Sequence, residues 1–166
     1  AVKDGQNRVR SMALVHEKFY QADALTEINF AEYVEKLNHF LFQSYSDKSN
    51  HVKLKVIADN VALDMDTAMP CGLLINEIVS NSLKYAFPDN KEGEIKIELR
   101  KLSGNDIEMS ISDNGIGMPK DFDIEQAESL GLQLIIALTS QLDGTLKVSA
   151  ENGTSYSFFF KYPKTQ

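Results

Sequence analysis

Three polar residues in one stretch of the chain have types and a spacing that suit chemistry on an anionic ligand. Glu77, Asn81 and Lys84 follow one another at intervals of four and three residues, which stacks them on one face of an α-helix. A carboxylate beside an amide oxygen offers donors that Mg²⁺ prefers, and a lysine one turn further can meet a phosphate. A solvent-exposed stripe is the common alternative, but asparagine disfavours helix interiors and is unusual in such a stripe.

A second segment, SDNGIGMP at residues 112–119, follows an alternating run that predicts a strand. Asp113 ends this strand, and Gly115, Gly117 and Met118 follow it. A tight turn would by itself explain the Asn-Gly pair. An acid at a strand end can also accept a hydrogen bond from an amine, such as adenine N6, and glycine allows positive φ and close backbone approach. We therefore expect a purine base beside Asp113.

The start of another predicted helix offers a place for phosphate. Leu130-Gly131-Leu132 opens this helix, and the free N–H groups and the dipole of a helix start favour anions. The chain has no G-x-x-x-x-G-K-[ST] loop, and Lys120 stands where a dinucleotide fingerprint needs its third glycine. Tyr85 adds a flat ring for stacking on a base. Together, the three segments predict a nucleotide site that is neither a P-loop nor a dinucleotide-binding fingerprint.

Composition limits the class of protein. A chain of 166 residues fits one domain, and its 43% apolar and 25% charged residues are typical of a globular one. Cys71 is the single cysteine, so we expect a reducing, cytoplasmic compartment and no disulfide framework. The net charge of −7 disfavours a general nucleic-acid binder. No apolar run has the length of a membrane span, and no signal peptide is visible.

The elements that must position these residues follow from hydrophobic periodicity and turn signals. Antiparallel hairpins with helices over one face predict an α+β fold, a two-layer α/β sandwich with a mostly antiparallel sheet. The opening helix could belong to a separate piece, with a boundary near Asp23. We expect helices over residues 7–21, 30–41, 67–86 and 129–142, two short strands within 51–65, and hairpins over 94–113 and 144–162.

Four motifs in order resemble those of the Bergerat-fold ATPases, which include gyrase, certain chaperones, mismatch-repair ATPases and sensor histidine kinases. Residues 76–87, 113–117, 130–132 and 152–154 are similar to the N box, the two glycine boxes and the final Gly-Thr element. The ending NSLKYAFP resembles the histidine kinases. The segments QNRVRSMALVHEKFYQ and DTAMPCGLLINEIVSNSLKYAFP are similar to their short-lid subfamily. The resemblance covers nearly the whole chain.

The resemblance implies a role for each matched residue. Asn81 would bind Mg²⁺, Glu77 would position or polarise the attacking group, and Lys84 would reach a phosphate; these are the implied catalytic residues. Asp113 would read adenine N6. Ser129 departs from the Gly-x-Gly pattern of many relatives, which bears on how a lid closes over ATP. The residues implied to contact ATP are Asn81, Lys84, Tyr85, Asp113, Gly115, Gly117, Met118, Gly131, Leu132 and Thr154.

The implied function is the ATP-binding catalytic domain of a two-component sensor histidine kinase. It would transfer the ATP γ-phosphoryl group to a histidine for relay to a response-regulator aspartate. The chain has no acceptor box rich in His, Arg and Asn, and its opening helix resembles the second dimerisation helix. We therefore expect a dimerisation remnant at 1–22, a catalytic domain at 23–166, and no phosphorylation of the chain by itself.

The implied partners are ATP, the histidine-bearing dimerisation helices of the parent kinase and a response regulator. A homodimer is possible, and we expect contact with neither nucleic acid nor membrane. His16 shares a stripe with Met12 and Phe19, so we expect a packed core or interface position rather than an acceptor. We expect His39 and His51 to be structural or exposed.

Two other functions compete with this one. A serine kinase or ATP-switched regulator resembling the anti-sigma factors would use Glu77 well, because a hydroxyl nucleophile gains from a nearby carboxylate base. The opening helix favours the histidine kinase instead. A binding module with a degenerate site is the third reading, and the intact Asp113 and Asn81 argue against it.

Overall fold

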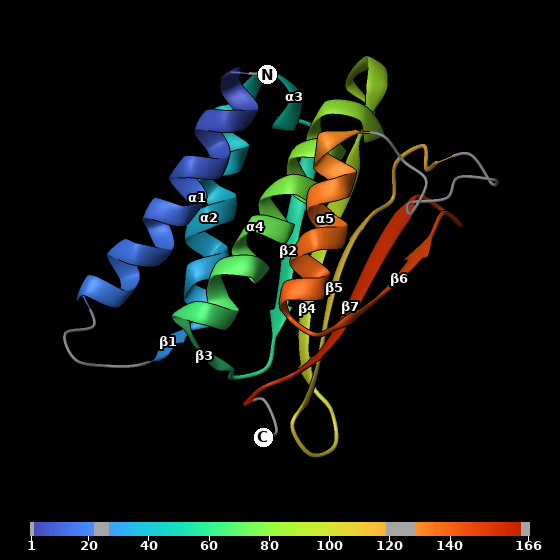
Figure 1. Cartoon of the computed structure of the whole chain (residues 1–166). Helices are drawn as coiled ribbons and strands as arrows, with labels where there is room; N and C mark the ends of the chain where they lie inside the picture. Colours follow the sequence, from blue (N-terminus) through green and yellow to red (C-terminus); the bar gives the residue numbers. More distant parts are fainter. Residues whose placement is uncertain (1, 22–26, 119–128, 164–166) are drawn as a thin grey trace.

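A five-stranded sheet forms one layer of the molecule, and the helices cover one of its faces (Figure 1). The computed structural model describes residues 2–21, 27–118 and 129–163. The strand order is β2-β4-β5-β7-β6, with β2 and β4 parallel and the other neighbours antiparallel. The predicted α+β sandwich is therefore confirmed. The strands are β2 (Val52–Ala58), β4 (Gly93–Lys101), β5 (Asp106–Asp113), β6 (Thr145–Ser149) and β7 (Thr154–Lys161).

The predicted short strands within 51–65 form, but they are not neighbours. The first is β2, whose partner is β4. The second is β3 (Ala62–Asp64), which pairs with β1 (Glu27–Asn29) in a separate two-stranded sheet. We did not predict β1, because three residues are too few to show an alternating pattern.

Side chains cap the starts of two of the helices. Asn29 caps α2 by accepting a hydrogen bond from the Glu32 N–H at 3.3 Å, and Asp64 caps α4 through the Thr67 N–H at 3.0 Å. The short α3 was not predicted. The helices are α1 (Val2–Gln21), α2 (Phe30–Ser44), α3 (Ser46–Ser49), α4 (Met65–Asn81), the π-helix η1 (Ser82–Ala86), the 3₁₀ turn η2 (Pro88–Asn90) and α5 (Leu130–Gln141).

The core lies between the sheet and the helices. Strand β4 turns Ile95 and Ile97 inward and β5 turns Met109 and Ile111 inward, at the period of two that a strand requires. The apolar faces of α2, α4 and α5 cover them, as in Leu74 at the middle of α4. This packing fixes α4 against the sheet, and its polar face remains for the site.

Helix α1 docks on α4 and α2 through a buried polar contact region, which we call the α1–α4 seam (Asn7 and Ser11 of α1, Asn76 of α4, and Tyr33 and Tyr45 of α2 and its C-terminal cap). The Ser11 hydroxyl donates to Asn76 Oδ1 at 3.1 Å, and the Tyr33 hydroxyl donates to the Ser11 carbonyl at 3.2 Å. Asn7 Nδ2 donates to the Tyr45 hydroxyl at 3.2 Å. Buried polar groups need such partners, so the seam fixes how α1 sits on α4.

The structure tests the predicted positions of the three histidines but does not test the predicted domain boundary. His39 and His51 are exposed, as expected. His16 is also exposed, so a position in the core of this chain was wrong, and an interface position stays a prediction. The predicted boundary near Asp23 lies outside the described residues and stays a prediction. Within the described ranges, every helix is too short or too polar to cross a membrane.

Candidate functional site

A cavity of about 570 Å³ lies where the end of α4, the end of β5 and the start of α5 meet. The structure brings the sequence-predicted residues together around it, with the exception of Gly115. Their individual roles remain predictions. The predicted residues that line the cavity are Glu77, Asn81, Lys84, Tyr85, Asp113, Gly117, Met118, Gly131, Leu132 and Thr154.

Asp113 is held at one end of the cavity by two hydrogen bonds. Its Oδ2 accepts from the Ser82 hydroxyl at 2.7 Å, and its Oδ1 accepts from the Gly115 N–H at 3.0 Å. An ionised carboxylate has about four acceptor positions, so it can still accept a bond from a ligand amine. Ser82 was missed as a site residue, because the sequence placed it only on the buried side of the helix.

The glycines after Asp113 serve different purposes. Gly117 has a φ of 77°, where glycine is strongly preferred. Gly115 is not among the described glycines with positive φ, and a Cβ there would lie 2.2 Å from the Ala86 carbonyl oxygen. The expectation that Gly115 makes room for a base is therefore corrected: it makes room for η1. The Ile116 N–H donates to the same carbonyl at 3.0 Å.

Tyr156 is a further residue at this end that the sequence reasoning missed. It lines the cavity from β7, in the alternating pattern that buries every second residue of that strand. Burial, together with the nearby Asp113 charge, raises the pKa of Tyr156 to about 12. The phenol therefore stays neutral at physiological pH. Ile78, Ala86 and Ile116 complete an apolar wall that suits a flat ring.

At the other end, α4 and α5 approach closely at Gly131. A Cβ on Gly131 would lie 3.1 Å from Glu77 Oε2 and 3.9 Å from Asn81 Nδ2. The acid and the amide of the predicted polar face therefore lie beside the first turn of α5. Helix starts favour anions, so this is the phosphate end of the cavity if a nucleotide binds there. We refer to the region around Asp113 as the base end.

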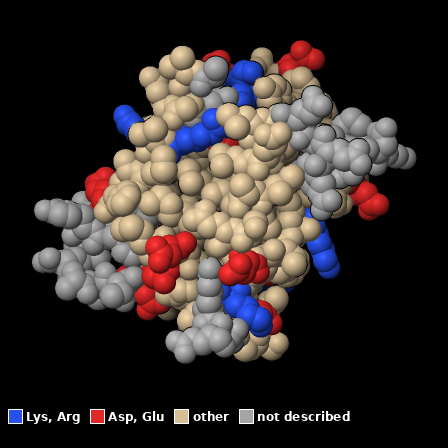
Figure 2. Space-filling view, in the orientation of Figure 1, with Lys and Arg blue, Asp and Glu red and all other residues tan. Residues whose placement is uncertain are grey.

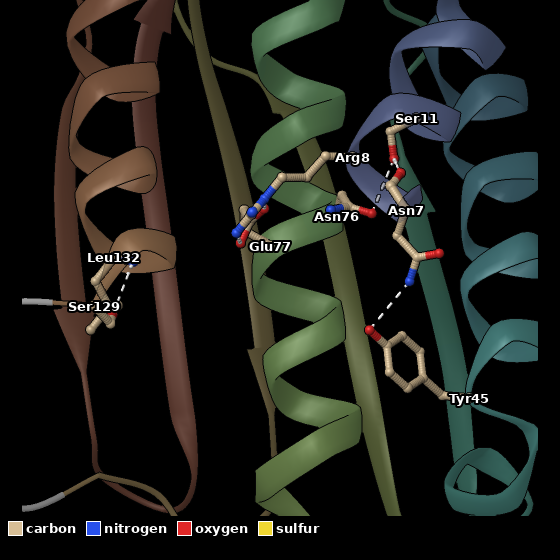
Figure 3. A network of polar contacts seen from close by, with 8 residues as sticks. All are labelled: Asn7, Arg8, Ser11, Tyr45, Asn76, Glu77, Ser129 and Leu132. Carbon is tan, nitrogen blue, oxygen red and sulfur yellow. Dashed lines mark hydrogen bonds and ion pairs between the residues drawn. The ribbon is translucent and has the colours of Figure 1, made fainter. Parts of the chain in front are cut away.

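Ser129, the residue that departs from the family pattern, caps α5. Its hydroxyl oxygen accepts from the Leu132 N–H at 3.3 Å (Figure 3). One of the two N–H groups predicted to contact phosphate is therefore already used by the cap. A phosphate at Leu132 would have to share or displace this bond.

Arg8 is the largest omission of the sequence reasoning. Its Nε and Nη2 donate to the two oxygens of Glu77, the second at 3.1 Å, in a bidentate ion pair. Figure 3 shows Arg8 reaching from α1 past α4, so that the pair lies on the side of α4 toward α5. The two residues are 69 positions apart, and no local spacing in the sequence signals such a contact.

Two acidic side chains of the cavity lining, Glu77 and Asp113, are balanced by two basic ones, so the cavity is less acidic than the chain as a whole, whose net charge is −7. The basic ones are Lys84 and Arg8. Figure 2 shows Lys and Arg atoms across the upper middle of this face; Asp and Glu atoms lie at its top edge, at its sides and in its lower part, where Lys and Arg atoms also lie. Tyr85 is 67% exposed, with Lys84 Nζ 5.4 Å from its ring centroid. The exposed Tyr85 ring has room to turn toward a ligand.

The donors at the phosphate end fit Mg²⁺ only in combination with a ligand. Among the described residues, no cluster of three or more His, Cys, Asp and Glu could hold a metal ion. Mg²⁺ commonly takes one or two protein oxygens and completes its shell with phosphates and water. Asn81 has an amide oxygen that could serve as a donor of this kind, and its side chain lies near the first turn of α5, as does that of Glu77.

The comparisons with known proteins agree with the fold. A family model described as "Histidine kinase-, DNA gyrase B-, and HSP90-like ATPase" matches residues 67–166, and a second, described as "Histidine kinase", matches residues 1–45. The second match covers α1 and α2, so the opening helices also follow a kinase pattern. The predicted resemblance is confirmed.

Individual relatives are sensor kinases. The chain is 29% identical over 158 residues to the sensor histidine kinase PdtaS of Mycobacterium tuberculosis, covering 93% of this chain and 31% of the relative. It is 30% identical over 106 residues to blue-light-activated histidine kinase 2 of Erythrobacter litoralis, covering 64% and 31%. The chain thus spans about a third of the length of these relatives (31%).

A solved structure has nearly the same arrangement. The histidine kinase domain of a blue-light activated histidine kinase from Erythrobacter litoralis superimposes with a TM-score of 0.85 at 25% identity. The match covers 95% of this chain and 74% of that one. Because the match covers 95% of this chain, it extends from the sandwich into α1.

Proposed function

Because the chain belongs to the family of histidine kinase-, DNA gyrase B- and HSP90-like ATPases and carries the ATP-binding domain of a histidine kinase, we propose that its cavity binds Mg²⁺-ATP and presents the γ-phosphoryl group to a histidine. The observation that carries this proposal is the convergence of Asp113, Asn81 and Gly131 on one cavity. They come from three separate segments, and each has the chemistry for a different part of ATP.

At the base end, the residues suit adenine. Asp113 would accept a hydrogen bond from adenine N6, and its own bonds to Ser82 and Gly115 hold it ready. Thr154 pairs with Asp113 across β5 and β7, which places it to contact the base. Tyr85 would turn onto the ring. This end supplies binding and orientation and takes no part in bond breaking.

At the phosphate end, the residues suit charge neutralisation and positioning, which dominate phosphoryl transfer. An imidazole nitrogen would attack Pγ with its lone pair, a new N–P bond would form, and the bond from Pγ to the β,γ-bridging oxygen would break, leaving ADP. Lys84 would approach the phosphates as a point charge. Asn81 would hold Mg²⁺, which when bound neutralises phosphate charge.

The Arg8–Glu77 pair favours a histidine acceptor over the hydroxyl acceptor of a serine kinase. A hydroxyl must lose a proton as it attacks, whereas a neutral imidazole already carries a lone pair. Both oxygens of Glu77 accept hydrogen bonds from Arg8. Such a carboxylate suits fixed charge better than proton transfer, so the catalysis would proceed without a general base at Glu77.

The partners follow from the same proposal. The acceptor histidine would lie on the dimerisation helices of the parent kinase, in a homodimer, and the phosphoryl group would pass to an aspartate of a response regulator. We place the domain in the cytoplasm, where ATP and such regulators are found together. The chain spans only about a third of the relatives (31%), so the acceptor helices and the response regulator are proposed as partners of the whole protein.

Phosphotransfer between two separate polypeptides tests this function. The chain is incubated with ATP radiolabelled at the γ-phosphate, Mg²⁺ and a dimerisation hairpin from its full-length parent. We expect label on the hairpin that is labile in acid and stable in base, as phosphohistidine is. Acid-stable label on a serine of an added protein would instead support the anti-sigma-like kinase, and no label in either case would contradict both.

A further inference from the structure

The Arg8–Glu77 ion pair joins α1 to α4, two helices that are matched by different family models. Glu77 belongs to the N box on α4, whereas Arg8 belongs to α1, ahead of the ATP-binding sandwich. The Arg8 side chain is 23% exposed and that of Glu77 is 7% exposed. Both line the cavity. The wall of the proposed phosphate end therefore includes a residue from the dimerisation region.

The charge of Glu77 needs compensation at this place. A nearly buried carboxylate loses most of its hydration, and without a partner it is costly to keep charged. It would also repel phosphates bound at the start of α5, because Glu77 Oε2 lies against Gly131. Arg8 removes both costs, since its bidentate contact balances the charge and fixes both carboxylate oxygens.

The fold holds Arg8 where it can do this. The neighbouring residue Asn7 and Ser11, one turn further along α1, are both buried in the α1–α4 seam. Their hydrogen bonds to Tyr45 and Asn76 fix the helix on both sides of Arg8. Figure 3 shows these bonds on one side of α4 and the ion pair on the other. The position of Arg8 is thus set by the docking of α1.

We propose that Arg8 is a positioning residue of the nucleotide site: acting through Glu77, it makes the phosphate end competent to bind Mg²⁺-ATP when α1 is docked on α4. The inference rests on the proposed function and extends it, because it makes one segment of the dimerisation region part of the ATP site. It predicts that replacing Arg8 weakens binding of a ligand that carries phosphates and leaves binding of adenosine unchanged.

Calorimetric titration of the whole 166-residue chain with two ligands tests this inference. The ligands are adenosine and a non-hydrolysable ATP analogue with Mg²⁺. Arg8→Gln should weaken binding of the analogue by about tenfold or more, as expected when one partner of a buried charge pair is removed, and leave adenosine binding within about twofold. Arg8→Lys should recover part of the loss. Arg10→Gln is the matched control, because Arg10 lies on the same helix but contacts the Phe40 ring.

A double-mutant cycle separates positioning from other roles. In a Glu77→Gln background there is no carboxylate charge to balance, so adding Arg8→Gln should change analogue binding by less than about twofold. An undiminished loss in that background would mean that Arg8 contacts the nucleotide directly, and would overturn the positioning role. Equal losses for adenosine and the analogue would mean that Arg8 only supports the fold, and would also overturn it.

The outcomes also distinguish this inference from the proposed function. A wild-type chain that binds neither ligand would contradict the nucleotide site itself, and the inference would fall with it. A wild-type chain that binds both, with Arg8→Gln binding both equally well, would leave the nucleotide site standing and refute only the role of Arg8. Thermal unfolding of each variant shows whether it is folded during the titration.

Discussion

The two ends of the cavity are built in different ways. At the base end, Asp113 is fixed by Ser82 and Gly115, and Gly115 in turn is packed against Ala86. These contacts connect β5 to η1, elements of the ATP-binding sandwich. At the phosphate end, Glu77 is fixed by Arg8, which α1 supplies from outside the sandwich.

This difference means that the two ends of the cavity are held by different parts of the chain. The base end is held within one packed unit, so we expect it to be the same whatever the position of α1. At the phosphate end, the proposed role of Arg8 would make nucleotide binding sensitive to how α1 is docked on α4. The following predictions address the contrast, from the largest expected effect to the smallest.

The largest expected effect is the difference in phosphorylation between the chain itself and an added acceptor hairpin. The chain alone, incubated with radiolabelled ATP, should acquire no acid-labile label, although the acceptor hairpin should be labelled under the same conditions. His16 is exposed on α1, so it is the histidine of that helix that must be tested as an alternative phosphoryl acceptor. Acid-labile label on the isolated chain that His16→Gln removes would make His16 the acceptor and would contradict the prediction.

Asp113→Ala should weaken binding of adenosine and of nucleotides alike, by at least about 1.4 kcal/mol or tenfold, because a buried polar contact to the base is lost. Calorimetric titration measures it. Asp106→Ala is the control, since Asp106 lies at the opposite end of the same strand and pairs with Lys161. Wild-type affinity in Asp113→Ala would refute the assignment of the base end.

Asn81→Ala should affect the phosphate end alone. We expect a loss of about 1 kcal/mol for nucleotide with Mg²⁺, roughly fivefold, the size of one polar contact. Binding of adenosine, and of nucleotide without metal, should barely change. Titrations with and without Mg²⁺ provide the comparison within one variant, and equal losses in both would reject a role through the metal.

Ser129→Gly should have the smallest effect and the opposite sign. Glycine at an N-cap costs the helix only a few tenths of a kcal/mol, and it releases the Leu132 N–H from the Ser129 hydroxyl. We expect tighter binding of nucleotide with Mg²⁺ by about twofold and unchanged binding of adenosine. Weaker nucleotide binding would mean that the cap helps to form the phosphate end.

The sequence predicted what depends on local spacing. The face of Glu77, Asn81 and Lys84 follows from helix periodicity, and these residues do line one cavity. The winding of η1 was not predicted: the helix continues to Ala86 as expected, but as a π-helix. Turns of this kind often occur at functional sites. Here the Ser82 hydroxyl contacts Asp113, 31 positions away.

What the sequence could not predict depends on contacts between distant segments. Arg8 lies in a segment that resembles the family, but its ion pair with Glu77 joins residues 69 positions apart. Gly115 is not among the described glycines with positive φ, and the atom that a side chain there would meet belongs to Ala86 rather than to a ligand. His16 shares a helical stripe with Met12 but is exposed on α1, because a stripe shows which residues share a face and leaves open whether that face is covered.

The orientation of a bound nucleotide tests the central claim most directly. A crystal structure of the chain with Mg²⁺ and a non-hydrolysable ATP analogue should show adenine N6 against the Asp113 carboxylate. The γ-phosphate should lie at the other end, near Asn81, Gly131 and the Arg8–Glu77 pair. A nucleotide bound in the reverse direction, or bound outside this cavity, would contradict the account.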